Sequence, residues 1–155
     1  MLEDLNRLLS QKDRKILFVG IGNLLKMDDG VGVYITRQIK DCKSISSLTV
    51  EVSIENYIGK INQLAPDILV LVDSVDLGLF PGDAKLLPVN QIIDLTFNTH
   101  NISLRRISDF FKMPVFILGI QPEKIGFGEN ISYLVRDKAD NIINLINTWE
   151  EKDGC

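Results

Sequence analysis

The chain has 155 residues, 45% hydrophobic and 25% charged, which is typical of one soluble globular domain. Its net charge of −4 gives no electrostatic reason to expect nucleic acid or a membrane as partner. Neither of the two cysteines belongs to a Cys-x-x-Cys pair, and no apolar run reaches the roughly 20 residues that span a bilayer. We therefore expect a cytoplasmic protein in which residues 1–155 form one domain, with residues 1–14 as a leading helix or extension.

Apolar runs alternate along the chain with segments of helical period. In the first half we expect, in chain order, a short helix at 2–9, a buried strand at 15–20, helical period from 28 to 39, a strand at 48–53, a helix at 57–64, and a central strand at 67–72. In the second half we expect an edge strand at 84–87, a helix at 104–111, a buried strand at 114–120 and a long final helix at 131–149. This alternation predicts an α/β fold, a three-layer sandwich in which helices cover both faces of a twisted, mostly parallel sheet of about five strands.

Polar residues follow the predicted strands at points where ligands usually bind. The first strand leads into Gly22-Asn23 and Asp28-Asp29, and the central strand runs into Asp73. In open α/β sheets, ligands lie beyond the carboxyl ends of the strands, so Asp29 and Asp73 are expected near each other. The place of His100, which precedes a predicted helix, does not follow from pattern alone.

Each of these residues also has an ordinary structural explanation. Acidic residues ahead of a helix commonly cap it, for about 1 kcal/mol, so we expect Asp28 to cap the helix or face solvent while Asp29 points into a cleft. Asp73 ends a run so apolar that burying its carboxylate is costly without a partner, which favours a functional role. His100 is the sole histidine, so any imidazole chemistry near neutral pH must use it.

The Gly20-x-Gly22 turn after the first strand suggests an alternative, a nucleotide- or dinucleotide-binding α/β domain. The match is poor, because Leu25 occupies the position of the third glycine and Glu51 lies within the second strand instead of at its tip. Neither a phosphate-binding Gly-x-x-x-x-Gly-Lys-Ser/Thr loop nor a Gly-x-Ser-x-Gly nucleophile motif occurs. A non-catalytic binding domain on the same fold is a third alternative, which the acid at Asp73 makes less favoured.

Six sequence blocks, in order from about Ile16 to Trp149, carry a resemblance to a known family. They are Val19 to Leu25 with Asp28 to Gly32, Leu71 to Asp76, Pro81-Gly82, Thr99 to Asn101, Leu118 to Pro122, and Ile125 to Phe127. Together they resemble the hydrogenase maturation protease family, and within it the branch that matures the large subunit of hydrogenase 3.

This resemblance implies an endopeptidase that removes the C-terminal extension from the large-subunit precursor of a nickel–iron hydrogenase after nickel insertion. It implies that Asp29, Asp73 and His100 are both the catalytic and the metal-contacting residues, and that Gly22 and Asn23 bind substrate. Nickel is expected to arrive with the substrate, without a permanently bound or organic cofactor, and the peptidase is expected to be of the aspartic or metal-dependent type. Two carboxylates and one imidazole suit a divalent transition ion and leave coordination positions open.

Overall fold

The computed structural model describes residues 2–11, 13–91 and 104–152, and in this part of the chain five strands form one sheet. The strands are β1 (Ile16–Ile21), β2 (Ile45–Glu51), β3 (Ile68–Ser74), β4 (Ala84–Pro88) and β5 (Val115–Ile120). Their spatial order is β2-β1-β3-β5-β4; β4 runs antiparallel at one edge and the other pairs are parallel. The expected mostly parallel sheet and its edge strand are confirmed.

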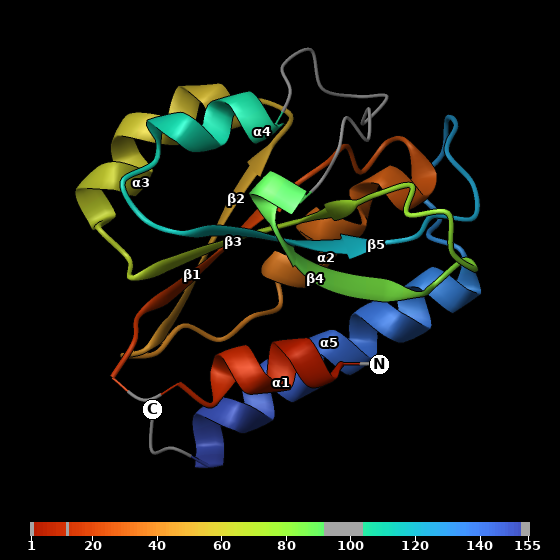
Figure 1. Cartoon of the computed structure of the whole chain (residues 1–155). Helices are drawn as coiled ribbons and strands as arrows, with labels where there is room; N and C mark the ends of the chain where they lie inside the picture. Colours follow the sequence, from red (N-terminus) through yellow and green to blue (C-terminus); the bar gives the residue numbers. More distant parts are fainter. Residues whose placement is uncertain (1, 12, 92–103, 153–155) are drawn as a thin grey trace.

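Helices cover both faces of this sheet (Figure 1). The α-helices are α1 (Glu3–Leu9), α2 (Val31–Thr36), α3 (Ile58–Leu64), α4 (Leu104–Ile107) and α5 (Tyr133–Lys152). The short 3-10 helices are η1 (Met27–Gly30), η2 (Ile54–Tyr57), η3 (Val89–Gln91) and η4 (Ser108–Phe110). One apolar core joins α1, α2 and α5 to the sheet, and a second joins α3 and α4 to its other face, so the three-layer sandwich is confirmed.

The two central strands, β1 and β3, are buried along their whole length. Their residues pack against helices on both faces, which explains why their sequences are apolar without alternation. Gly20 of β1 pairs with Val72 of β3, and Asp73 pairs with Gly119 of β5. The carboxyl ends of the three strands therefore lie side by side, and the loops that follow them share one edge of the sheet.

Several elements differ from their predicted bounds, among them the second strand and the helical segment after β1. The second strand begins at Ile45 and ends at Glu51, where the backbone turns into the left-handed region at φ 57°, so Glu51 is at the tip of the strand and not within it as expected. The helical segment predicted at 28–39 is divided: residues 27–30 form the 3-10 helix η1, and α2 spans only Val31–Thr36. Tyr34 of α2 donates a hydrogen bond of 2.7 Å to Asp140 of α5, and this hydrogen bond, together with partial burial, raises the pKa of the Tyr34 phenol.

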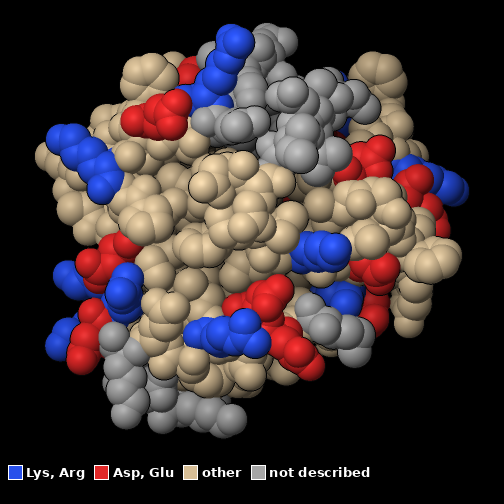
Figure 2. All heavy atoms as spheres, in the orientation of Figure 1, with Lys and Arg blue, Asp and Glu red and all other residues tan. Residues whose placement is uncertain are grey.

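Charged side chains of both signs are interspersed around the face shown in Figure 2, with uncharged surface between them. Among the described residues, no helix combines the length and the apolar character that crossing a bilayer needs. The surface of this face therefore lacks the broad single-sign field that long-range attraction of nucleic acid requires.

Candidate functional site

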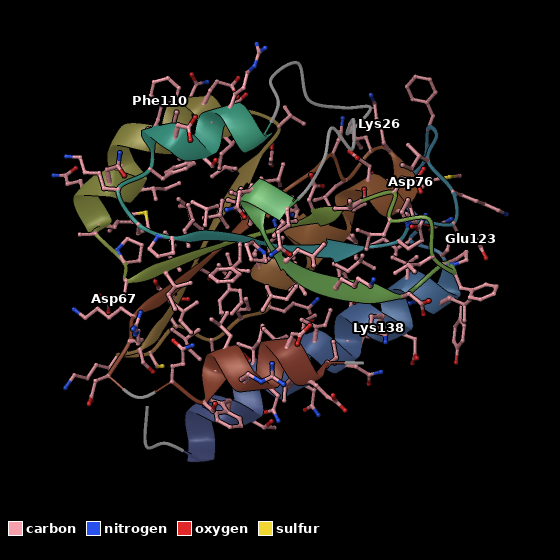
Figure 3. All side chains as sticks on the ribbon, viewed as in Figure 1. Lys26, Asp67, Asp76, Phe110, Glu123 and Lys138 are labelled. Carbon is pink, nitrogen blue, oxygen red and sulfur yellow. The ribbon has the colours of Figure 1, made fainter. Side chains whose placement is uncertain are left out.

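The candidate site lies at the edge of the sheet where β1, β3 and β5 end. Lys26, Asp76 and Glu123, which follow these three strands, lie at one end of the molecule (Figure 3). Asp67, which precedes β3, lies at the opposite end. Three loops that are distant in sequence therefore meet at the carboxyl edge, as expected for a ligand site on an open α/β sheet.

Asp29 connects the loop after β1 to the end of β3. Its side chain is buried, with 2% of the residue exposed. The carboxylate accepts a hydrogen bond of 2.9 Å from the backbone N–H of Asn23, and its other oxygen lies 3.5 Å from the Ser74 hydroxyl. Because Ser74 directly follows Asp73, these contacts bring the Asp29 carboxylate to the end of the central strand.

Asp73 is equally buried, with 1% exposed, and one carboxylate oxygen accepts a hydrogen bond of 2.8 Å from the Ser74 N–H. Gly22 lies between the two acids. A Cβ atom added at Gly22 would be 3.6 Å from Asp73 Oδ1 and would overlap the carbonyl oxygen of Asp29. The structure thus brings Asp29 and Asp73 together on either side of Gly22, as expected from their places after two adjacent strands.

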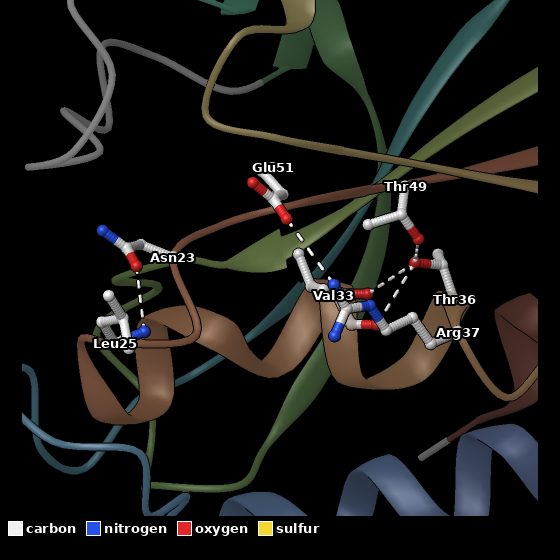
Figure 4. Close-up of polar contacts among 8 residues, drawn as sticks. Asn23, Leu25, Val33, Thr36, Arg37, Thr49 and Glu51 are labelled. Atoms are coloured by element: carbon white, nitrogen blue, oxygen red, sulfur yellow. Dashed lines mark hydrogen bonds and ion pairs between the residues drawn. The ribbon is translucent and has the colours of Figure 1, made fainter.

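The other predicted substrate-binding residue, Asn23, gives the loop its shape. Its side-chain oxygen accepts a hydrogen bond of 2.9 Å from the Leu25 N–H, which closes a tight Asx turn (Figure 4). Because the backbone N–H of Asn23 donates to the Asp29 carboxylate, Asn23 stabilises the turn and also holds the Asp29 side chain in position. The described contacts of Asn23 are internal, so its role toward substrate stays a prediction.

Asp28 differs from its predicted role. It neither caps α2 nor faces solvent; it is fully buried. Its carboxylate accepts three backbone hydrogen bonds from the segment after β5, at 2.8 Å from Glu123, 2.8 Å from Lys124 and 2.6 Å from Ser132. The prediction was wrong because these partners lie about a hundred residues further along the chain, whereas an acid before a helix suggests only a local contact.

His100 lies outside the described residues, so its predicted position beside the two carboxylates stays a prediction. Within residues 2–11, 13–91 and 104–152, no group of three histidine, cysteine, aspartate or glutamate side chains could hold a metal ion. Asp29 and Asp73 supply two oxygen donors, which by themselves do not complete the three or four protein ligands of a permanent transition-metal site.

Gln121 is a buried polar residue that sequence reasoning missed. It is 8% exposed, and its side-chain oxygen accepts hydrogen bonds from the backbone of Leu77 at 2.6 Å and Leu79 at 3.2 Å. Its amide nitrogen donates to Asp76 at 3.2 Å. Gln121 therefore joins the loop after β3 to the end of β5. The signal was available, because a polar residue directly after an apolar strand is the pattern that identified Asp73.

The Gly20-x-Gly22 turn is explained by packing within the chain. A Cβ atom at Gly20 would overlap the hydroxyl of Thr36, which lies 3.0 Å from the Thr49 hydroxyl beneath the strand (Figure 4). A Cβ atom at Gly22 would overlap the backbone of Asp29. Both glycines are needed for α2 and η1 to approach β1, so the motif requires no bound pyrophosphate, and the dinucleotide alternative loses its main support.

Replacing Gly22 is expected to disrupt the site through the fold. Gly22 has φ 137°, and Gly22→Ala adds a methyl group against the Asp29 carbonyl, so we expect a loss of several kcal/mol, about 3 or more, or failure to fold. Gly59→Ala is the matched control, because Gly59 lies in α3 with no atom near its missing Cβ. It should gain about 0.5–1 kcal/mol from helix propensity. Urea unfolding of both variants tests this; an unchanged midpoint for Gly22→Ala would contradict the described packing.

Comparison with known proteins identifies the family to which the chain belongs. The profile described as HycI, hydrogenase maturation protease, matches residues 52–149. The hydrogenase 3 maturation protease of Escherichia coli K12 is 28% identical over 140 residues, which cover 86% of this chain and 90% of that protein. A putative hydrogenase maturation protease of Methanocaldococcus jannaschii is 29% identical over 156 residues, covering 89% and 90%.

Solved structures agree with the sequence matches. The crystal structure of a [NiFe] hydrogenase maturation protease HycI from Thermococcus kodakarensis has the same fold, with a TM-score of 0.82 at 23% identity and coverage of 95% of this chain and 99% of that one. The solution structure of the endopeptidase HycI from Escherichia coli gives a TM-score of 0.77 at 27% identity, with coverage of 88% and 91%. Since the profile spans well over half of the sequence, the chain belongs to the hydrogenase maturation protease family.

Proposed function

We propose that this chain is the endopeptidase that removes the C-terminal extension from the large-subunit precursor of a nickel–iron hydrogenase, after nickel has been inserted. The observation that carries the proposal is the pair of buried carboxylates, Asp29 and Asp73, held on either side of Gly22 at the carboxyl edge of the sheet. Relatives described as hydrogenase 3 maturation protease and as endopeptidase supply the reaction class.

Two buried acids at one place favour binding of a cation. Each carboxylate loses hydration when buried, and two nearby negative charges repel each other, so a divalent ion between them offsets both costs. In our proposal this ion is the nickel of the precursor, which Asp29 and Asp73 contact together with His100. The precursor therefore brings its own metal, and an unloaded precursor lacks the group that these residues recognise.

Nickel contact also positions the bond to be cut. A peptide that runs past Gly22 and Asn23 passes directly beside both acids, because Gly22 lies between them. A water molecule then attacks the scissile carbonyl, activated either by one of the carboxylates as general base or by nickel, which lowers the pKa of bound water. The released proton is available to the leaving amine, so cleavage gives a new carboxyl end on the subunit and a free peptide.

Co-expression tests the proposed function in cells. A nickel–iron hydrogenase large-subunit precursor with its C-terminal extension is produced in a host that lacks its own maturation protease, with and without this chain. We expect the shortened subunit only when this chain is present and nickel is supplied. A precursor that stays full length in every cognate pairing, despite loaded nickel, would contradict the proposal.

A further inference from the structure

The loop that follows β5, residues 121–132, exposes large apolar side chains beside the site. Phe127 is 92% exposed and Ile125 is 44% exposed, and Leu25 on the neighbouring loop is 59% exposed. Single exposed apolar residues are common on soluble proteins. Here, however, the two loops are joined, since the Gly128 N–H donates to the Leu25 carbonyl at 2.9 Å. The three exposed side chains therefore stand on two loops that are held together.

This loop is fixed to the residue that precedes Asp29. Asp28 accepts hydrogen bonds from Glu123 and Lys124 near the beginning of the loop and from Ser132 at its end. In the opposite direction, the backbone N–H of Asp28 donates to the Lys124 carbonyl at 3.1 Å. A buried carboxylate with three N–H donors holds both ends of the loop. The exposed apolar residues are thus presented by an anchored segment, next to the candidate catalytic acid.

We infer that residues 121–132 form a docking loop for the folded body of the precursor: Phe127 and Ile125, with Leu25 on the neighbouring loop, contact an apolar surface beside the C-terminal extension, and Asp28 is the positioning residue that holds the docking loop in place. This inference rests on the proposed function. The partner is the precursor, because the loop is hydrogen-bonded to Asp28 and Asp28 is adjacent in sequence to Asp29 of the site. A folded substrate whose C-terminal tail is cut beside Asp29 places a neighbouring surface against this loop.

Phe127→Ser tests the contact directly. Phe127 is almost fully exposed, so this change should leave the melting temperature unchanged. Burial of such a side chain at an interface commonly contributes a tenfold change in affinity, so we expect KM for nickel-loaded precursor to rise about tenfold with kcat nearly unchanged. Phe110→Ser is the matched control: Phe110 is 66% exposed but precedes β5, at the opposite end of the molecule (Figure 3). Its KM and kcat should both stay at wild-type values.

Asp28→Asn tests the positioning role. The amide keeps the volume but places an NH2 group against backbone N–H donors, so the loop should loosen. We expect KM to rise as in Phe127→Ser, and the double variant to bind hardly more weakly than either single one, since both act through one loop. Ile142→Val, in the buried core of α5, controls for general loss of stability and should leave KM unchanged below its melting temperature. If Asp28→Asn fails to fold, the comparison of Phe127→Ser with Phe110→Ser still decides whether the docking loop contacts the precursor.

The outcomes separate the docking loop from the proposed function. An unchanged KM for Phe127→Ser, while the wild-type protein cuts the precursor, overturns the docking loop and leaves the proposed function standing. Failure of the wild-type protein to cut any loaded precursor overturns both. Sedimentation gives a third result: a wild-type dimer that Phe127→Ser converts to a monomer, with KM unchanged, would assign this surface to a second copy of the chain and overturn the inference.

Discussion

Asp73→Asn is expected to lower the rate of precursor cleavage by about a hundredfold or more while leaving the fold intact. The amide has nearly the same volume, and its carbonyl oxygen can still accept the hydrogen bond from the Ser74 N–H. What it loses is the negative charge that, in the proposed mechanism, contacts nickel and activates water. We expect the melting temperature to change by no more than about 4 °C, measured beside a cleavage assay on the same preparation.

Asp67→Asn is the matched control for this change. Asp67 precedes the same strand at its other end, where it accepts a hydrogen bond of 2.8 Å from the Lys15 N–H. Asp67→Asn makes the same chemical replacement far from the site, so this variant should cleave the precursor at the wild-type rate. If Asp73→Asn instead melts well below wild type, by the 1–3 kcal/mol or so of a broken buried hydrogen bond, and still cleaves normally, then Asp73 has a structural role only.

Cleavage is expected to depend on nickel in the precursor and not on metal bound beforehand to the protease. Asp29 and Asp73 give two oxygen ligands, and His100 is the only imidazole in the chain, so any metal site of its own is weak. Precursor without nickel should be cut at least about a hundredfold more slowly than loaded precursor. Nickel added to the protease alone, followed by removal of free metal, should not restore cutting.

Two variants sharpen the nickel prediction. His100→Ala should weaken recognition of the loaded precursor without lowering the melting temperature. The same replacement at the partly buried Lys138 should change neither recognition nor the melting temperature. Lys138 lies on α5, away from the loops that follow β1, β3 and β5 (Figure 3). Efficient cutting of metal-free precursor in the presence of a chelator would instead favour hydrolysis by Asp29 and Asp73 alone.

The sheet and the pairing of the two acids could be predicted from sequence because the signals are local. An apolar run without alternation indicates a strand covered on both faces, and two such strands became β1 and β3. An acid in the loop after one strand and an acid at the carboxyl end of the other then fall at the same edge whenever the strands are parallel neighbours. The sequence pattern therefore predicted correctly that Asp29 and Asp73 are neighbours, although it could not predict the distance between their carboxylates.

The connections between loops could not be predicted, because they depend on contacts remote in sequence. Asp28 accepts hydrogen bonds from residues 95 to 104 positions away, and Gln121 accepts them from residues 42 and 44 positions away. No periodicity or motif in the sequence indicates the hydrogen-bond partners of either residue. Likewise, the apolar spacing of the final helix predicts Leu134 on its buried stripe, but Leu134 is 50% exposed, and its backbone carbonyl lies close to Gly82.

One measurement tests the central claim most directly: the intact mass of a purified, nickel-loaded large-subunit precursor before and after incubation with this chain. We expect the precursor mass to fall by that of its C-terminal extension, with the matching peptide released, and no change with Asp73→Asn. An unchanged precursor mass with the wild-type protein, or equal cleavage by wild type and Asp73→Asn, would contradict an endopeptidase acting through the Asp29–Asp73 site.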